Sequence, residues 1–285
     1  RAKATPGLRA AARLFCARTP NHDLHPPGHP TSLPFFLPEP RPPPVMTWNI
    51  PSVIPLPENF TGFDPSSAIP PENFTSYERH LPHWRIPGAC YFTTFRLRDS
   101  IPKAVLEKMR REDLEWKQRL AKPSAQQGGM PSPVEFQAWQ EFKRARLRKL
   151  ELLLDEGRGE CLLRVPAYRE TVEKALRHFE GDRHEMLAWT VMPNHVHALL
   201  RPLHEHLLED LCGSWKWFTA SKIQAALQRA GPLWQEENFD RIIRDAAHYE
   251  KAVRYIANNP VKANLPPGQA SAGFCQSIRA ANGWP

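Results

Sequence analysis

The sequence predicts an α+β fold, with helices packed on one face of an antiparallel sheet. Three observations favour this class. Only a few segments alternate in the way that strands do, and two of them are separated by a very short turn. The rest of the folded part has the longer periodicity of helices. Strands joined by so short a turn pair antiparallel, which leaves the helices to cover the sheet.

The predicted strands are short. ACYFTTFRL (89–97) alternates aromatic and β-branched residues and ends shortly before a proline. HEMLAWTVM (184–192) and HVHALLRP (195–202) are two more strands, joined at Pro193 and Asn194. So tight a connection predicts a β-hairpin.

The predicted helices include a charged pair and an amphipathic one. Residues 103–120 and 133–155 are helical in pattern and are separated by the flexible loop AKPSAQQGGMPSP. We expect them to form a solvated helical insertion at about 103–160. VPAYRETVEKALRHF (165–179) is amphipathic and has a proline in its first turn, where the missing amide is tolerated.

Proline divides the chain into a tail and a folded domain. Of the 31 prolines, 17 fall within the first 80 residues, which cannot hold regular helices or strand ladders for long. We expect residues 1–78 to be a disordered proline-rich tail that is dispensable for folding. The domain then covers 79–265, and an irregular tail covers 266–285. The first methionine is Met46, and a fragment, or a reading frame extended beyond a true start at Met46, would explain this.

Charge and cysteine usage limit the function classes. The chain of 285 residues has a formal net charge of +8. This favours a polyanionic partner, and nucleic acid comes before membrane because no basic amphipathic helix stands out. No stretch approaches the roughly 18 apolar residues of a membrane span. The five cysteines lie far apart without a CxxC pair, which is typical of reduced thiols and of a cytoplasmic location.

Two histidines stand one residue apart in the second strand of the hairpin, within VMPNHVHALL (191–200). Residues i and i+2 of a strand point to the same face, so the imidazoles of His195 and His197 project side by side. Two neutral imidazoles form a bidentate site for a divalent cation, which needs a third protein ligand. In the alternative reading, one histidine is a hydrogen-bonded surface residue and the other packs beside the sheet.

A second stretch, AAHYEKAVRYIANNPVKANL (246–265), supplies candidate partners for the histidines. It is predicted to be helical from Ala246 to about Asn259 and to stop at Pro260. Tyr255 and Asn259 are four residues apart and are therefore neighbours on one helix face. A tyrosine hydroxyl next to an amide oxygen can place a nucleophile and a third metal ligand beside one ion. The alternative is a core tyrosine followed by a C-terminal asparagine cap.

Three motifs in this order, MPNHVH, PLWQEENFDRIIRD and RYIANNPVKANL, resemble the REP-associated tyrosine transposases of the single-tyrosine HUH class. The resemblance covers roughly residues 80–265. It implies a ferredoxin-like core and an enzyme that cleaves and rejoins single-stranded or hairpin DNA through a 5′-phosphotyrosine, as a monomer or homodimer. It also implies that His195, His197 and Asn259 hold Mg²⁺ or Mn²⁺ and that Tyr255 is the nucleophile.

Basic residues near these motifs are candidates for contacts with DNA. In the predicted helix LLEDLCGSWKWFTASKIQAALQ (207–228), Lys216 lies between two tryptophans and Lys222 lies farther along. Lysines neutralise phosphates, and an exposed indole stacks on an unpaired base. Arg241 and Arg244 are three residues apart, share a face and could clamp phosphates. In the alternative, the tryptophans belong to the core, the lysines are only solvated, and nearby aspartates pair with the arginines.

Two other functions remain as alternatives. A non-catalytic single-strand binding module would use the sheet as RNA-recognition domains do, but the strands have no RNP-type aromatic run. A metal-dependent nuclease would use activated water in place of the tyrosine. Only the tyrosine mechanism produces a covalent adduct between protein and DNA. The chain has no GxxxxGK[ST] phosphate loop, in keeping with a reaction that needs no ATP.

Overall fold

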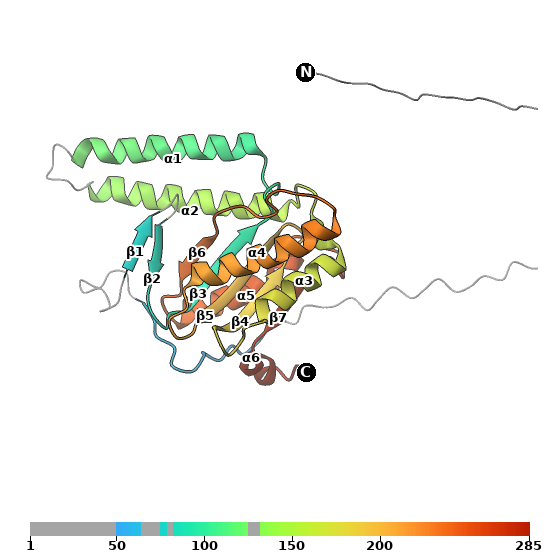
Figure 1. The fold of residues 1–285 in the computed structure, drawn as a ribbon. Coiled ribbons are helices and arrows are strands. Elements are labelled where there is room, and N and C mark those ends of the chain that lie inside the picture. Colours follow the sequence, from blue (N-terminus) through green and yellow to red (C-terminus); the bar gives the residue numbers. More distant parts are fainter. Residues whose placement is uncertain (1–49, 64–74, 79–81, 125–131) are drawn as a thin grey trace, which may run out of the picture. The chain divides into compact units, whose positions relative to one another are not determined.

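The computed structural model describes residues 50–63, 75–78, 82–124 and 132–285. Its main sheet has five strands, all antiparallel, in the order β6-β3-β5-β4-β7, and β1 and β2 pair separately (Figure 1). The strands are β1 Thr75–Glu78, β2 Pro82–Arg85, β3 Tyr91–Arg96, β4 His184–Val191, β5 His195–Pro202, β6 Phe239–Ile242 and β7 Ser271–Phe274.

The connections of the main sheet are those of a ferredoxin-like fold. β3 is followed by α3 (Pro166–Arg177) and β4, and β5 is followed by α4 (Leu208–Ala226) and β6. In this β-α-β-β-α-β order the first strand, β3, lies between the last strand, β6, and the third strand, β5. The predicted α+β class, the antiparallel sheet and the β4–β5 hairpin at Pro193 and Asn194 are confirmed.

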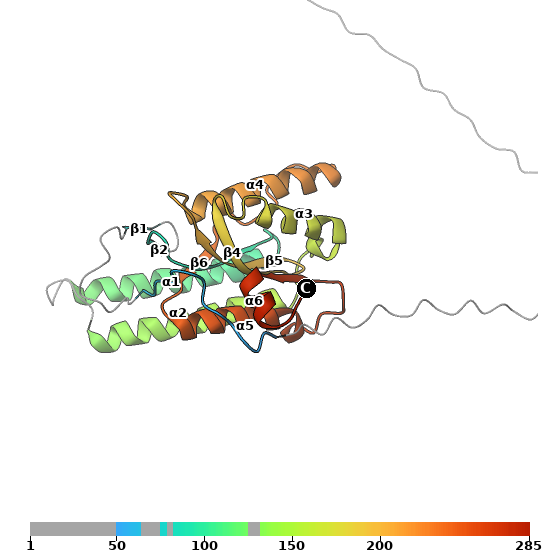
Figure 2. The same ribbon diagram turned by 90° about the horizontal axis from the view of Figure 1, so that it is seen from below.

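Helices cover both faces of the sheet, whereas the sequence predicted helices on one face. α3 and α4 lie on one side, where Phe95, Leu176 and Trp215 share a buried core. α5 (Ala246–Lys262) lies on the other side (Figure 2). Its Ile256 shares a second buried core with Phe92 of β3. The prediction was wrong on this point because the central strands are apolar on both sides, and both sides therefore need a cover.

The predicted insertion consists of two long helices, α1 (Lys103–Ser124) and α2 (Pro133–Asp155) (Figure 1). Arg146 of α2 forms an ion pair with Asp113 of α1, which ties the two helices together. A 3₁₀ turn at Leu162–Arg164 then leads into α3.

Local sequence signals set the starts of the helices. The hydroxyl of Ser132 accepts a hydrogen bond from the backbone of Glu135 while the carboxylate of Glu135 binds back, which is a capping box at the start of α2. The carboxylate of Asp245 accepts a hydrogen bond from the backbone of His248 at the start of α5. Pro260 was expected to end this helix but lies inside it, two residues before its last residue, Lys262. A proline so close to the end removes only one backbone donor.

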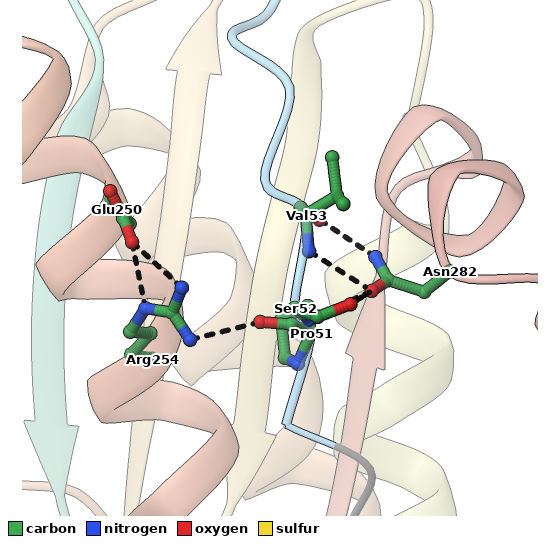
Figure 3. A network of polar contacts seen from close by, with 6 residues as sticks. All are labelled: Pro51, Ser52, Val53, Glu250, Arg254 and Asn282. Atoms are coloured by element: carbon green, nitrogen blue, oxygen red, sulfur yellow. Dashed lines mark hydrogen bonds and ion pairs between the residues drawn. The ribbon is translucent and has the colours of Figure 1, made fainter.

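Residues 50–63 form an extended segment, called the strap below, that is bound to the rest of the chain. The side-chain oxygen of Asn282 accepts hydrogen bonds from the backbone of Ser52 and Val53, at 2.8 and 3.2 Å (Figure 3). The amide nitrogen of Asn282 donates to the carbonyl of Val53 at 2.7 Å. One asparagine thus reproduces the pattern by which a neighbouring strand would bind the strap.

The strap also contacts α5 and the core. Arg254 of α5 donates to the carbonyl of Pro51 at 3.0 Å (Figure 3). The ring of Phe60 packs against Tyr249 with 5.9 Å between ring centroids, and Phe63 is buried. Because α5 carries two of the predicted site residues, the strap braces the helix on which the site depends.

Both predicted tails require correction. Residues 50–63 were expected to be disordered, but they pack on the domain because an extended proline-containing segment needs no regular ladder to do so. Residues 1–49 and 64–74 of that predicted tail lie outside the described residues, and its last four residues form β1. Residues 266–285 were expected to be irregular, but they include β7 at the edge of the sheet and α6 (Gln276–Ala281).

Two further expectations concern the membrane and the cysteines. None of the described helices is long and apolar enough to cross a membrane. The four cysteines among the described residues are free thiols. They are Cys90, Cys161, Cys212 and Cys275.

Tyr249 provides a test of the packing beneath α5. Its side chain is 1% exposed, and its hydroxyl makes no hydrogen bond in the described part of the chain. A buried hydroxyl without a partner costs about 1–3 kcal/mol. We therefore expect Tyr249→Phe to raise the free energy of unfolding by about 1 kcal/mol. Thermal denaturation measures this, and a lower melting temperature for the variant would contradict it.

Candidate metal and tyrosine site

The β4–β5 hairpin sets the position of the two histidines. His195 and His197 stand opposite Arg96 and Thr94 of β3, on the face of the sheet that α5 covers. Both side chains are buried, and their Nε2 atoms lie 3.1 Å apart. The predicted histidine pair is thus brought together, as the spacing of two residues on a strand requires.

Asn194 fixes the position of the hydrogen on His195. The amide nitrogen of Asn194 donates to the carbonyls of Leu154 and Arg158 at 3.3 and 3.1 Å, so the amide oxygen faces the imidazole. Nδ1 of His195 lies 2.7 Å from that oxygen and must donate, because an amide oxygen only accepts. Nε2 of His195 therefore directs a lone pair toward His197.

Thr94 forms a hydrogen bond with His197 that, unlike the bond from Asn194 to His195, can run in either direction. Its hydroxyl lies 2.7 Å from Nδ1 of His197, and a hydroxyl can either donate or accept. When His197 donates from Nε2 to His195, Thr94 donates to Nδ1. When Nε2 instead binds a cation, Nδ1 donates to Thr94. Both forms of His197 keep their hydrogen bond, so a cation can be bound without leaving a polar atom unpaired.

Burial keeps both imidazoles neutral. The loss of water lowers the pKa of His195 to about 3, a shift that Asn259 opposes and that the charge of Lys262 increases. The pKa of His197 is lowered well below its ordinary value, first by burial and then by His195 and Lys262. Only a neutral imidazole binds a metal ion, so both rings are in the form that binding needs at neutral pH.

α5 places Tyr255 and Asn259 beside the histidines. The ring of Tyr255 meets His197 edge-on, with 5.1 Å between ring centroids, and meets Phe92 at 5.7 Å. Asn259 is 1% exposed and lies close enough to His195 and Tyr255 to shift the pKa of both, but neither of its amide atoms has a partner at good hydrogen-bonding geometry in the described part of the chain. A buried amide with both atoms unused is costly, which is the arrangement expected of a ligand site.

These donors fit a divalent cation. Neighbouring ligands of an octahedral ion with bonds of about 2.1 Å lie about 3.0 Å apart. The Nε2 atoms of His195 and His197 are 3.1 Å apart, and Asn259 adds an unused amide oxygen. Within the described residues, no group of three or more His, Cys, Asp and Glu side chains is arranged to hold a metal. The fit therefore depends on the amide as third ligand.

We expect Mn²⁺ to bind the full chain and not the double variant His195→Ala/His197→Ala, because this variant loses two of three ligands. Isothermal titration calorimetry measures the affinity. The matched control is His178→Ala/His206→Ala, which removes two exposed histidines away from the site. Equal affinity in wild type and in the His195/His197 variant would reject the metal site.

The hydroxyl of Tyr255 is covered and protonated. Its oxygen is buried and makes no hydrogen bond within the described residues. Burial raises the pKa of Tyr255, and the carboxylates of Glu151 and Asp155 on α2 raise it further. The end of α2, which the sequence placed in a solvated insertion, thus faces the predicted nucleophile.

Two of the four candidate DNA contacts are on α4, which covers the opposite face of the sheet. Lys216 donates to the carbonyl of Glu236 at 2.6 Å and so helps to hold the segment before β6. Lys222 is exposed. Of the two tryptophans beside Lys216, Trp215 belongs to the core and Trp217 is 75% exposed. Trp215 is therefore a core residue, as the alternative interpretation held. The indole of Trp217 is available for stacking on an unpaired base.

The other two candidates do not share a helix face. Arg241 is in β6, a strand that the sequence did not predict, and Arg244 follows it in the connection to α5. Burial lowers the pKa of Arg241, and the nearby carboxylate of Glu151 opposes the shift. Because its charge also acts on Tyr255, Arg241 lies near the site. Arg244 is exposed.

Sequence reasoning missed the residues that support the site. Asn194 looked like a turn residue and Thr94 like any strand residue, and only the register of the sheet reveals their hydrogen bonds. Asp155 and Lys262 form an ion pair with 2.9 Å between Oδ2 and Nζ. The position of Lys262, seven residues after Tyr255, was the available signal, since two helical turns bring a residue back to the same face.

Together these features define a ferredoxin-like domain with two histidines on a central strand and a tyrosine on the facing helix. Residues 163–259 match the family described as Transposase IS200 like, which confirms the resemblance found in the motifs. The matched segment contains the predicted nucleophile, the three predicted metal ligands and the four predicted DNA contacts. A solved structure of the REP-associated tyrosine transposase bound to a REP hairpin is 17% identical, with a TM-score of 0.34, over 66% of this chain and 73% of that chain. No curated protein that was compared matches the chain.

Proposed function

We propose that this chain is a metal-dependent transposase that cleaves and rejoins single-stranded or hairpin DNA, with Tyr255 as nucleophile. The observation that carries the proposal is the convergence of Tyr255 and an unpaired Asn259 on two neutral histidines whose Nε2 atoms are 3.1 Å apart. The match to IS200-like transposases supports a DNA-processing enzyme.

Mg²⁺ or Mn²⁺, held by His195, His197 and Asn259, would supply positive charge to the non-bridging oxygens of a phosphodiester. The chain's own residues orient the groups around it. Asn194 and Thr94 hold the imidazole rings through their Nδ1 atoms. All three ligands are uncharged, so they leave the charge of the cation undiminished for the phosphate.

The reaction transfers a phosphoester bond from DNA to the protein. The phenolic oxygen of Tyr255 bonds to phosphorus as the bond from phosphorus to the 3′ oxygen breaks. The phenol loses its proton, and the departing oxygen gains one. The products are a 5′-phosphotyrosine and a strand with a free 3′ hydroxyl. Attack by a hydroxyl on the phosphotyrosine reverses the exchange and rejoins strands without ATP.

A non-catalytic module that binds single strands is the second candidate. One observation favours it, which is the burial of the Tyr255 hydroxyl near the end of α2. A covered nucleophile reaches a phosphate only after α2 or the tyrosine moves, whereas a binding module needs no such movement.

An adduct assay separates the candidates. The full chain is incubated with Mn²⁺ and a library of labelled single-stranded hairpins, and the products are separated on a denaturing gel. The proposal expects a labelled band that contains protein covalently bound to DNA. It also expects a released strand that a polymerase can extend from its 3′ end. Cleavage without the band would indicate a nuclease that uses water, and binding without cleavage would indicate the binding module.

A further inference from the structure

We propose that Lys262 binds the phosphate that Tyr255 attacks and that Asp155 is the positioning residue that holds Lys262 for this role. The inference rests on the proposed function and adds two residues to it. Both lie outside residues 163–259, the segment that matches the transposase family. They come from different parts of the chain, Asp155 from the end of the inserted helix α2 and Lys262 from the end of α5.

The first step is the position of the ammonium group. Nζ of Lys262 lies 5.9 Å from the ring centroid of Tyr255. The ring of Tyr255 in turn lies 5.1 Å from that of His197, centroid to centroid, which places the ammonium near the candidate metal ligands as well. A phosphate placed between the Tyr255 hydroxyl and the histidines therefore comes within reach of this flexible side chain.

The second step is the partner of Lys262. Its Nζ lies 2.9 Å from Oδ2 of Asp155. The side chain of Asp155 is only 11% exposed, and neither of its oxygens receives another hydrogen bond within the described residues. The side chain of Lys262 is 46% exposed. The carboxylate is thus fixed, while the ammonium has donors directed toward water that a phosphate can occupy.

The third step is the anchoring of Asp155. The carbonyl of the preceding residue, Leu154, accepts a hydrogen bond from Asn194, the residue that also orients His195. The end of α2 is therefore tied to the histidine hairpin. Asp155 keeps a defined place relative to the site, and through it Lys262 does as well.

The balance of charge near Tyr255 shows why the lysine matters. Glu151 and Asp155 are negative, while Arg241 and Lys262 are positive. A phosphodiester adds one negative charge and is repelled by both carboxylates. An ammonium that contacts Asp155 and the phosphate at once removes this repulsion and stabilises the negative charge of the transition state.

The test uses the full chain and four variants. They are Lys262→Met, Lys262→Arg, Asp155→Asn and the double variant Lys262→Met/Asp155→Asn, which removes both charges and so leaves no buried carboxylate unpaired. The matched controls are Lys174→Met and Glu170→Gln. These alter an exposed ion pair of similar length on α3, with 2.8 Å between its atoms.

Two quantities are measured for each variant. Fluorescence anisotropy with a labelled single-stranded hairpin library in EDTA, over a salt series, gives the affinity without a metal. The rate of adduct formation in Mn²⁺ gives the chemical step. Lys262→Met should bind about tenfold more weakly, as expected for the loss of one charge-assisted hydrogen bond, with a salt slope lower by about 0.7. The double variant should also bind more weakly than wild type, but by less, because it also removes a carboxylate that repels the phosphate. Lys262→Arg should retain the affinity.

Asp155→Asn provides the readout that a purely structural ion pair would not give. It removes a repulsive charge and frees the ammonium, so binding should be as tight as in wild type or tighter. Adduct formation should nevertheless be about tenfold slower, because Lys262 is no longer held in place. Opposite effects on binding and on rate would support the positioning role.

The proposal is overturned if Lys262→Met and the double variant match Lys174→Met in affinity, salt slope and adduct rate. The positioning role of Asp155 is overturned if Asp155→Asn weakens binding as much as Lys262→Met does. If wild type binds hairpins but forms no adduct, the proposed enzyme fails, and the affinities still decide whether Lys262 contacts phosphate. If wild type binds no single strand, both proposals fail.

Discussion

Tyr255→Phe is expected to abolish the covalent protein–DNA adduct while leaving the fold and metal binding intact. The change removes one oxygen, and that oxygen is the atom that bonds to phosphorus. The hydroxyl has no partner at good hydrogen-bonding geometry in the described part of the chain, so its loss should cost little stability. The ring keeps its contacts with His197 and Phe92. The expected loss of adduct is complete rather than partial, because no other atom of the side chain can replace the nucleophile.

Tyr249→Phe is the matched control, because it makes the same chemical change on the same helix. Tyr249 is six residues before Tyr255, which places it about 120° away around the helix. Its ring packs against Phe60 of the strap and not against the histidines. A denaturing gel after incubation with Mn²⁺ and labelled hairpins should show the adduct with wild type and Tyr249→Phe only. An adduct with Tyr255→Phe would mean that the nucleophile is misassigned.

The candidate site could be predicted in its main residues because each pair lies on one regular element. His195 and His197 are two residues apart on a strand, and Tyr255 and Asn259 are four apart on a helix, so local periodicity alone places each pair on one face. That the two pairs meet depends on α5 lying over β5, which the family resemblance implied and local periodicity does not determine.

The supporting residues could not be predicted because they depend on long-range packing. Asn194 binds carbonyls about forty residues earlier in the chain, at Leu154 and Arg158, and Asp155 meets Lys262 over an even longer separation. A helix with the charged sequence of α2 can have its end either in solvent or against the site, so the sequence does not distinguish the two environments. Charge alone therefore predicted a solvated helix where the end of the helix is in fact partly buried.

The fold was predicted best where hydrophobic periodicity is strong and worst where segments are short. The β4–β5 hairpin follows from the alternation around Pro193 and Asn194. β6 and β7 have four residues each, too few to establish a period, and both were missed. The strap, residues 50–63, has no period at all and is held by Asn282, which lies more than 200 residues later in the sequence. Composition alone therefore predicted disorder there.

Removal of the strap is expected to destabilise the domain, contrary to the expectation from its proline content. The strap places Phe63 in the core and packs Ile54 and Phe60 against the core that lies under α5. Loss of one large buried aromatic side chain costs about 3–5 kcal/mol. The bonds to Asn282 and Arg254 are lost as well. A variant that lacks residues 1–63 should therefore be less stable than the full chain by at least about 3 kcal/mol.

Thermal denaturation of three variants assigns this loss to the strap. For a domain of this size a loss of 3 kcal/mol lowers the melting temperature by about 6–12 °C. A variant that lacks only residues 1–49 keeps the strap and should melt like the full chain, as the predicted disorder of that segment requires. Asn282→Ala keeps the whole chain and should lose only about 1 kcal/mol, because the exposed backbone of Ser52 and Val53 can bind water in place of the lost acceptor. If the variant without residues 1–63 melts at the same temperature as the one without residues 1–49, the strap contributes nothing to stability and the original expectation of a dispensable tail is correct.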